Sequence, residues 1–360
     1  MLHKLRVGIV GSGIGSSHVQ AFHNLPEQFQ VLAICDIDEA KARVLAETHH
    51  IPRIVTNLAD LCRMDDLDVI DICTPPYLHY PQTREALAAG KHVICEKPHA
   101  GSLQELDELI ALEAKSDKRI MPIFQYRYGH GVQKLKLLIE AGLAGPAYLS
   151  TVETHWRRKP EYFAVPWRGK WQTELGGALV SLAIHAHDLI SYVLGPAKQV
   201  FAQAKTMVNA IQVEDCVTAS LEMADGSLVS LSVTTGSAAE ISRHRFCFRD
   251  LTAESNNHPY DNSHDPWTFT ADSPELQADV EAALAGFKPL PQRFTGQFYR
   301  YHQALHTNTE LPVTLADARA ALELITALYH SADTGQVVKL PIGRDHPKYA
   351  GWQPEQRQQP

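Results

Sequence analysis

The sequence lacks the features that mark several large classes of protein. No stretch approaches about 18 consecutive apolar residues, the length that a membrane-spanning helix needs. It has no basic block, and 33 Lys and Arg stand against 41 Asp and Glu, for a formal net charge of -8, which argues against a nucleic-acid partner. Internal repeats, low-complexity tracts and a signal-peptide pattern are also missing. We therefore expect neither a membrane nor a nucleic acid as partner.

Cysteine is scarce as well. The six cysteines are scattered without a Cys-x-x-Cys pair, and four of them lie in or beside apolar runs. This pattern is typical of reduced, mostly buried thiols. We therefore expect a cytoplasmic protein.

What is present fits a globular protein of two domains, or at most three, because domains usually hold roughly 100–200 residues and this chain has 360. Hydrophobic residues make up 44% and charged residues 21%, which is ordinary for such a protein. The unusual count is 19 histidines. Histidine titrates near neutrality and binds metals, so the count raises the question of catalysis or a metal site.

The first 125 residues alternate between two kinds of segment. Apolar runs of strand length are separated by segments with helical periodicity, one of which begins at a capping box, Ser102 to Glu105. This alternation predicts a parallel sheet with helices on both faces. The predicted strands are 6–10, 31–35, 69–73, 92–95 and 120–124, and the predicted helices are 18–25, 38–49, 58–63, 80–89 and 103–114.

After residue 124 the pattern changes. Alternating β-rich segments dominate, and Asp225-Gly226 between two of them is typical of a hairpin turn. This half predicts a mostly antiparallel sheet, with a long polar loop over 254–267. The predicted strands are 147–156, 199–207, 216–223, 227–234 and 244–248, and the predicted helices are 131–141, 275–286 and 316–331.

The first predicted strand ends in a glycine-rich turn, Gly11-Ser12-Gly13-Ile14-Gly15. Glycines let main-chain N–H groups approach a pyrophosphate at the start of a helix. The turn lies between a strand and a helix in the first βαβ unit, as a dinucleotide site requires. It departs from the usual spacing because Ser16 stands where the third glycine is expected. A purely structural turn is the alternative.

The second predicted strand ends at an acid, Asp36. An acid there can accept hydrogen bonds from the adenosine ribose hydroxyls and repel a 2′-phosphate, which favours NAD over NADP. Two alternatives stay open: Asp36 caps the helix that begins near Asp38, or Asp38 shares the ribose role.

Three further segments carry a family resemblance. They are Thr-Pro-Pro-Tyr-Leu-His at 74–79, Gly-Lys-His-Val-Ile-Cys-Glu-Lys-Pro at 90–98, and the run from Gly-Gly to His-Ala-His-Asp at 176–188. With the glycine turn, they resemble the glucose–fructose oxidoreductase, inositol dehydrogenase and rhizopine catabolism (Gfo/Idh/MocA) family of NAD(P)-dependent oxidoreductases. The second segment is the most specific, and the resemblance covers nearly the whole chain.

The resemblance implies an α/β protein. An N-terminal Rossmann domain (1–124) with a doubly wound parallel sheet would precede an α+β domain (125–345) with a large, mostly antiparallel open sheet. The second domain would bind substrate and mediate assembly into a homodimer or homotetramer. A late helix would pack back on the Rossmann domain, and 346–360 would be a polar tail.

The resemblance also implies the chemistry, which is hydride transfer between NAD and a secondary alcohol of a sugar, sugar derivative or polyol. Lys97 would lie beside the reacting carbon, and His185 would take or give the proton. Thr74, Pro75, His79 and Glu96 would lie beside the cofactor. In the inositol dehydrogenase branch an aspartate precedes the histidine by four residues, whereas Ser181 stands here. This difference weighs against an inositol-like substrate.

These residue types suit that reaction. A neutral His185 can accept the hydroxyl proton, and a positive Lys97 can stabilise the alkoxide that develops. If 176–188 is helical, Ser181, His185 and Asp188 share one face, and Asp188 could orient the imidazole. His187 would point about 200° away from His185, so we expect no metal site.

The segment 155–171 is dense in arginine and tryptophan. Aromatic faces pack on sugar rings, and arginine forks bind carboxylate or phosphate. We therefore expect Trp156, Arg158, Trp167 and Arg168 to contact substrate, with a structural or oligomer-contact loop as the alternative. Arg127 is a further candidate, near the nicotinamide or the substrate.

The sequence therefore predicts an NAD-dependent sugar or polyol dehydrogenase. One alternative is a redox-neutral glycoside hydrolase or lyase that oxidises C3 transiently with bound NAD and eliminates the aglycone. Another is a non-catalytic NAD-binding regulator, against which the pair Lys97 and His185 speaks.

Overall fold

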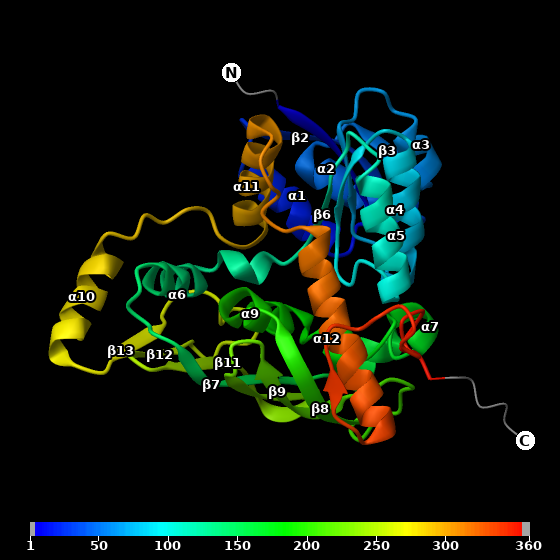
Figure 1. Cartoon of the computed structure of the whole chain (residues 1–360). Coiled ribbons are helices and arrows are strands. Elements are labelled where there is room, and N and C mark those ends of the chain that lie inside the picture. Colours follow the sequence, from blue (N-terminus) through cyan, green and yellow to red (C-terminus); the bar gives the residue numbers. More distant parts are fainter. Residues whose placement is uncertain (1–3, 355–360) are drawn as a thin grey trace, which may run out of the picture. The chain divides into compact units, whose positions relative to one another are not determined.

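The computed structural model describes residues 4–354 (Figure 1). The chain forms two compact units. The first comprises the chain up to Gln125 together with Pro291–Arg319, and the second comprises Tyr126–Leu290 together with the chain from Ala320 onward. The sequence assigned 125–345 to one domain, whereas 291–319 group with the first unit.

The first unit holds a six-stranded parallel sheet in the order β3-β2-β1-β4-β5-β6, with helices between successive strands. The central strands are buried on both faces and therefore read as continuous apolar runs. This confirms the predicted doubly wound sheet; only the three-residue β3 was not predicted. The strands are β1 Leu5–Val10, β2 Phe29–Cys35, β3 Arg53–Val55, β4 Val69–Ile72, β5 His92–Cys95 and β6 Ile120–Pro122, and the helices are α1 Gly15–His23, α2 Glu39–His49, α3 Leu58–Cys62, η1 Pro76–Leu78, α4 His79–Ala88 and α5 Leu103–Glu113.

The strand order reverses between β1 and β4, which are neighbours in the sheet. In such sheets ligands bind outside the carboxyl ends of the strands at this reversal. The chain leaves β1 at Gly11, β2 at Asp36, β4 at Cys73-Thr74 and β5 at Glu96. All the motif segments of the first unit therefore meet at one edge of the sheet.

The first unit is completed by a helix that the sequence did not predict, α11 (Arg293–Thr307). It packs on α1, and the rings of Phe22 and Phe298 stack with centroids 4.2 Å apart and planes 7° apart. Phe298 is fully buried. One late helix, α11, thus packs on α1 within the first unit, and the first residues of the next helix, 315–319, group with that unit as well.

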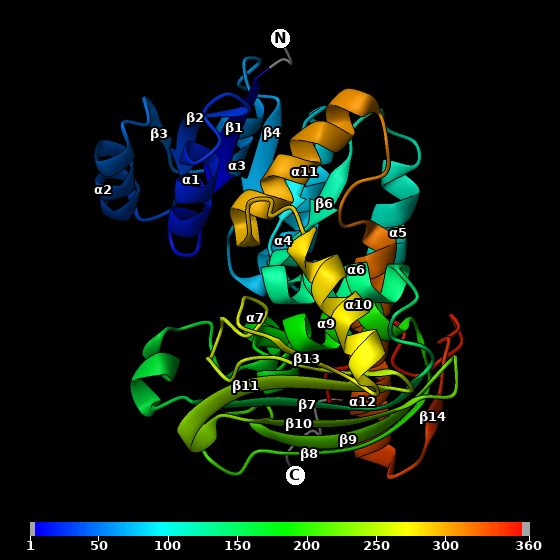
Figure 2. The ribbon, with the colours of Figure 1, turned by 90° about the vertical axis from the view of Figure 1, so that its left-hand side faces the viewer.

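The second unit contains an eight-stranded sheet in the order β13-β12-β11-β7-β10-β9-β8-β14, antiparallel except for the pair β7 and β10. Figure 2 shows α6, α9 and α10 over one face of this sheet. The predicted large open sheet is confirmed. The strands are β7 Ala147–Arg157, β8 Ala197–Lys205, β9 Cys216–Met223, β10 Leu228–Thr234, β11 Gly236–Phe248, β12 Leu251–Glu254, β13 Thr268–Ala271 and β14 Val338–Lys339, and the helices are η2 Gln125–Tyr128, α6 His130–Glu140, η3 Pro160–Ala164, α7 Trp171–Glu174, α8 Ala178–Ser181, α9 Ile184–Leu194, α10 Pro274–Ala285 and α12 Leu315–Thr334.

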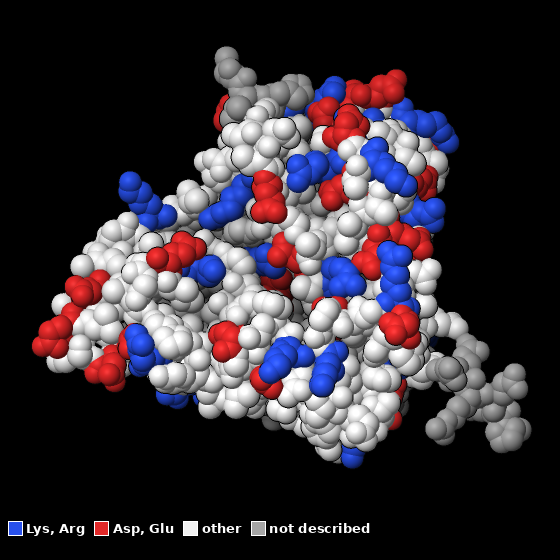
Figure 3. All heavy atoms as spheres, viewed as in Figure 1, with Lys and Arg blue, Asp and Glu red and all other residues white. Residues whose placement is uncertain are grey.

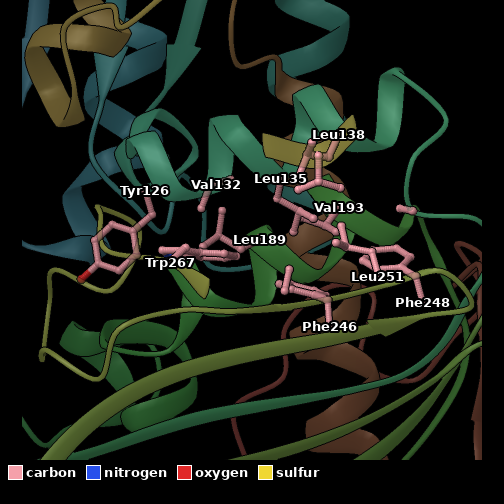
Figure 4. Close-up of a cluster of buried hydrophobic side chains, with 13 residues drawn as sticks. Tyr126, Val132, Leu135, Leu138, Leu189, Val193, Phe246, Phe248, Leu251 and Trp267 are labelled. Carbon is pink, nitrogen blue, oxygen red and sulfur yellow. The ribbon is translucent and has the colours of Figure 1, made fainter. Parts of the chain in front are cut away.

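The core of the second unit lies between helices and sheet (Figure 4). Leu135 and Leu138 of α6 and Leu189 of α9 meet aromatic side chains from β11, among them Phe246. Gly131 lies so close to Trp267 that a Cβ there would be 2.0 Å from the indole. This packing holds α9, which carries His185, against the sheet.

The end of the described chain is not simply a polar tail. Trp352 is fully buried, and its Nε1–H donates to the carbonyl oxygen of Leu175 at 2.5 Å. The prediction of a polar tail over 346–360 is therefore wrong for Trp352, which anchors this stretch, and residues 355–360 lie outside the described part.

Within residues 4–354 no single helix is long and apolar enough to cross a membrane. One bent pair of helical segments, Trp171–Ser181 with Ile184–Leu194, is long and apolar enough for a membrane span by length and composition only. In Figure 3, acidic and basic side chains are interspersed over the visible face. The figure shows no large basic area of the kind that nucleic-acid binding uses.

Replacing Phe298 with Ala should destabilise the first unit by about 3–5 kcal/mol, because it removes a fully buried ring and leaves a cavity under α11. All five tryptophans lie in the second unit. The urea midpoint reported by circular dichroism should therefore fall more than the midpoint reported by tryptophan fluorescence. Phe201→Ala is the control, since Phe201 lies exposed on β8. An equal loss of unfolding free energy in both variants would contradict the role of α11.

Candidate functional site

The glycine turn has the geometry of a dinucleotide cradle. Gly11 has φ +94°, and a Cβ there would lie 2.6 Å from the carbonyl oxygen of Cys73, so only glycine fits. A Cβ on Gly13 would meet nothing within 4 Å, which leaves its main chain open to a ligand. Gly15 packs α1 against β1, where its Cβ would lie 3.1 Å from Ile9. No side chain caps the start of α1, although Ser16 N and Ser17 N donate to the carbonyl oxygens of Gly13 and Ile14. An uncapped helix start of this kind suits an anion such as a pyrophosphate.

Asp36 supports the turn and does not cap α2. Its Oδ2 accepts hydrogen bonds from the main chain of Ser12 at 2.8 Å and from the Ser12 hydroxyl, and its Oδ1 accepts from Asp38 N. Asp38 itself caps α2, through a bond from Lys41 N. The capping alternative for Asp36 is therefore wrong. A carboxylate with four lone-pair sites retains room for the ribose hydroxyls, so the chain's residues fit NAD.

The 74–79 segment is tied to the 90–98 segment through His79. Its buried ring places Nε2 2.7 Å from the carbonyl oxygen of Thr74 and Nδ1 2.7 Å from that of Pro98. Thr74 donates its hydroxyl to Gln82. His79, which we predicted beside the cofactor, thus joins two main-chain segments, and Thr74 and Pro75 lie directly at the end of β4.

Glu96 and Lys97 follow β5 at the same sheet edge as the glycine turn. Glu96 is buried, and its Oε2 accepts a hydrogen bond from Lys97 N at 3.0 Å. Its Oε1 lies 3.2 Å from Nε2 of His18, a residue of α1. Glu96 therefore connects the main chain of Lys97 to the helix that begins at the glycine turn.

The 176–188 segment is not one helix, which corrects the prediction. It divides into α8, which ends at Ser181, and α9, which begins at Ile184. The Ser181 hydroxyl donates to the carbonyl oxygen of Gly177 at 2.8 Å, within its own turn. Only His185 and Asp188 of the predicted face belong to the same helix.

His185 is stacked on Tyr126, with ring centroids 4.6 Å apart and planes 15° apart. The sequence did not single out Tyr126. Its only local indication is its place beside Arg127 in Gln125-Tyr126-Arg127-Tyr128. The stack restricts the plane in which the imidazole can turn.

Arg127 and Asp188 form a buried ion pair. Nε and Nη2 of Arg127 donate to the two Asp188 oxygens at 2.8 and 2.5 Å, and the guanidinium lies over the ring of Tyr192. Such two-pronged pairing satisfies a buried charge better than a single contact. Asp188, predicted to orient His185, is thus also the counter-ion of Arg127, one helical turn along α9.

In the arginine- and tryptophan-rich segment, the indole of Trp156 is buried, and its Nε1–H donates to Ser242. The Arg158 guanidinium lies 5.2 Å from the Trp156 ring, 4.9 Å from Tyr162 and 5.3 Å from Tyr260. Cation–π contacts of this kind stabilise a protein's own fold. The structure therefore uses Trp156 and Arg158 internally.

Arg168 and Trp167 lie in a less buried neighbouring position. The Arg168 guanidinium is 4.2 Å from the Trp167 ring, contacts the Tyr162 hydroxyl and lies 3.5 Å from Glu174. Both residues are only partly exposed. Glu174 also accepts from Gly169 N, so this contact joins the segment to α7.

The sequence missed Glu214, a buried carboxylate behind the Gly176-Gly177 turn. It accepts hydrogen bonds from Gly177 N, Leu179 N and the Tyr329 hydroxyl, each at 2.9 Å. Burial raises the pKa of Glu214 to about 7, although these hydrogen bonds oppose the shift. Glu214 anchors the start of α8, and Tyr329 comes from α12, 115 residues away along the chain.

His187 lies two residues beyond His185 but in a different environment. Burial, with a smaller effect of His244, lowers the pKa of His187 to about 3. A ring with so low a pKa is a very weak base and is unsuited to accept a hydroxyl proton. His187 therefore belongs to the core, which leaves His185 as the candidate of this segment for proton transfer.

Comparison with known proteins decides the family. Residues 5–124 match the model described as oxidoreductase family, NAD-binding Rossmann fold, and residues 132–249 match the GFO/IDH/MocA C-terminal domain. The chain belongs to the Gfo/Idh/MocA family. The first unit is its NAD-binding Rossmann domain, which agrees with the cradle at Gly11–Gly15.

Several relatives are similar over most of the chain. D-glucoside 3-dehydrogenase of Escherichia coli K12 is 26% identical over 93% of this chain and 97% of its own. The structure of the WlbA dehydrogenase of Bordetella pertussis with NADH and UDP-GlcNAcA has a TM-score of 0.83, 26% identity, and coverage of 95% of this chain and 100% of that chain. A glycosyl hydrolase family 109 protein of Streptomyces filamentosus is 33% identical, but over 49% of this chain and 38% of its own.

Replacing Glu214 with Gln should change how stability depends on pH. The pKa of Glu214 is about 7 in the folded protein and near 4.5 when unfolded, so the folded state holds a proton that the unfolded state releases. The stabilisation from this proton is complete below about pH 4.5 and is lost as the pH rises to 7.

The difference in free energy of unfolding, wild type minus Glu214→Gln, should therefore fall between pH 4.5 and 7 and then level off. Urea titrations followed by tryptophan fluorescence, which reports the second unit, measure it. The control is Glu47→Gln, at an exposed position, whose difference from wild type should stay flat. A flat difference for Glu214→Gln as well would refute the raised pKa.

Proposed function

We propose that the protein is an NAD-dependent oxidoreductase that acts on a secondary alcohol of a sugar, sugar derivative or polyol. The observation that carries this proposal is the place of Lys97, which follows β5 at the sheet edge where β1 ends in the dinucleotide cradle. A cation there suits an oxygen that becomes negative during oxidation. The named activity of the E. coli relative and the ligands of the Bordetella neighbour support the sugar class.

Gly11–Gly15 would hold the pyrophosphate of NAD, Asp36 the ribose hydroxyls, and Thr74, Pro75 and Glu96 the part of the cofactor that crosses the sheet edge. Bound NAD supplies the hydride acceptor. The preference for NAD follows from Asp36, whose charge would repel the extra phosphate of NADP. Because Asp36 also holds Ser12, it couples the ribose site to the turn.

Lys97 and His185 divide the remaining chemistry. The substrate hydroxyl must lose its proton as its carbon loses hydride, and His185 takes that proton. Lys97 stabilises the developing alkoxide by its charge and lowers the pKa of the hydroxyl. The stack on Tyr126 keeps the His185 ring in one plane, and in the reverse direction His185 returns the proton.

Substrate contacts beyond these two residues would come from the second unit. Trp167 and Arg168 are partly exposed and can offer a ring face and a guanidinium edge. Trp156, Arg158, Arg127 and Ser181 would shape the surroundings of the substrate, since each already makes a contact within the unit.

We also propose a homodimer or homotetramer, assembled through the face of the eight-stranded sheet that lies opposite α6 and α9 (Figure 2). Leu149 and Leu228 are exposed there on adjacent strands in direct register. Apolar side chains exposed in pairs favour burial against another chain.

The variants Lys97→Ala and His185→Ala should each bind NAD normally. Each should lower turnover by about 10²–10⁴-fold, the range for losing a positioned acid–base or electrostatic group. Calorimetric titration with NAD and a spectrophotometric rate measure the two quantities. Lys115→Ala and His258→Ala, at exposed positions, serve as matched controls. Near-normal turnover in either site variant would rule out its assigned role.

The glycoside hydrolase relative supports one alternative, redox-neutral cleavage with transient oxidation at C3. A p-nitrophenyl glycoside with NAD separates the two functions when absorbance at 340 nm and free phenol are recorded together. The dehydrogenase should accumulate NADH with intact glycoside. Release of phenol without net NADH would establish the alternative instead.

A further inference from the structure

An acid stands where the central sheet should be apolar. β4 is buried along its whole length, and the Asp71 side chain in it is fully buried. Within residues 4–354 its Oδ1 is buried and has no hydrogen-bond partner. A buried carboxylate needs a compensating charge, because desolvation otherwise costs several kcal/mol. The compensation must come from the group that meets Oδ2.

That group is His18, whose ring lies between two carboxylates. Nδ1 is 2.8 Å from Asp71 Oδ2 and Nε2 is 3.2 Å from Glu96 Oε1. An ionised carboxylate only accepts hydrogen bonds, and a neutral imidazole has one N–H to donate. Serving both acids therefore requires both ring nitrogens to carry protons, which makes His18 an imidazolium.

The other surroundings of His18 agree with a fixed positive charge. Burial alone would lower the pKa of His18, but the charge of Asp71, with smaller effects of Cys73 and of the hydrogen bond to Asp71, outweighs burial and raises the pKa well above 6.5. Burial raises the pKa of the Cys73 thiol to about 12, so the sulfur 3.4 Å from Nδ1 stays neutral. On the remaining sides the ring meets Phe294 and Phe298, at centroid distances of 4.4 and 5.3 Å.

One ring thus joins three elements of the sheet edge. His18 lies on α1, which the glycine turn begins; Asp71 lies on β4; and Glu96 follows β5. The second oxygen of Glu96 accepts from Lys97 N at 3.0 Å. A shift of the ring would therefore be passed to the main chain of Lys97.

We propose that His18 is a positioning residue for Lys97, a permanently charged link between the helix of the dinucleotide turn and the Glu96-Lys97 main chain. This proposal rests on the proposed function for its effect on turnover, but not for the state of the ring. Cofactor cradle and Lys97 then share one rigid support. A misplacement of about 1 Å can cost 10²-fold in rate, which gives the expected scale.

The state of the ring can be tested without a substrate. In protein labelled with ¹⁵N-histidine, the His18 signals, assigned by their loss in His18→Phe/Asp71→Val, should show two protonated nitrogens from pH 6 to 9. A single N–H at pH 7 would overturn the proposal. So would stoichiometric zinc or another metal in the purified protein, because the Nδ1, Oδ2 and Sγ atoms of His18, Asp71 and Cys73 lie within 4.8 Å of one another.

Two variants separate positioning from stability. His18→Phe/Asp71→Val removes the His18–Asp71 ion pair as a unit, and Glu96 keeps its bond from Lys97 N, so the variant should fold, because apolar replacement of a buried ion pair is often neutral or stabilising. It should bind NAD but lose ten-fold or more in kcat, with little change in KM. In Asp71→Asn the amide can donate to Nδ1 while Nε2–H still serves Glu96, so kcat should stay within about three-fold of wild type.

A double variant that folds, binds NAD and keeps wild-type kcat would show that His18 is merely structural, and the proposal would fail.

Acylation of Lys97, followed by peptide mass spectrometry with Lys115 as internal reference, gives a readout that needs no turnover. The rate of acylation of Lys97 should be several-fold higher in the double variant than in wild type and should be unchanged in Asp71→Asn. If no alcohol is oxidised by wild type, the proposed function fails while the labelling and the NMR still decide the role of His18. Glu113→Gln is the matched control, since Glu113 accepts from a main-chain amide, Ile120 N, away from Lys97.

Discussion

Charge that leaves water must be met by opposite charge or by several hydrogen bonds, and this constraint organises the interior of both units. In the first unit a histidine between two acids satisfies it. In the second, Arg127 meets Asp188 with two bonds, and Glu214 collects three donors. Each of these groups lies beside a segment that carries a motif. These buried charges are therefore concentrated where the chain must hold a particular shape.

The histidines illustrate how environment assigns different tasks to one side chain. His18 is held charged by its acids, His187 is held neutral by burial, and His79 joins two carbonyl groups. His185, stacked on Tyr126 on the helix behind the Gly-Gly turn, is the one whose surroundings suit proton exchange. A high histidine count therefore does not imply a metal centre, because each ring can have a separate use.

The sequence predicted most elements of the parallel sheet because strands buried on both faces leave continuous apolar runs with helical periodicity between them. It did not predict β3, which is three residues long, or α11, although Phe294, Phe298 and Tyr301 recur at helical spacing. The break between α8 and α9 was missed because no glycine or proline occurs between Ala178 and Leu194. Long-range contacts decide such features, and the local sequence marks them weakly or not at all.

The same distinction holds for the site. Lys97 and His185 became candidates through the family resemblance of the segments that carry them, and the glycine turn through its place between a strand and a helix. Tyr126 and Glu214 act through contacts with residues 59 and 37 positions away, and no local pattern marks them. Asp188 was found, but its pairing with Arg127 depends on how η2 and α9 meet in the folded unit.

The return of residues 291–319 to the first unit has a consequence for how the protein is made. A ribosome releases the six strands of the parallel sheet early, but Phe298, which covers Phe22, is synthesised only after β13 and α10. Until then the apolar side of α1 stays open to solvent. The nascent first unit therefore lacks the cover of α11 while nearly half the chain is still being translated, so its final packing must wait for the second unit to be made.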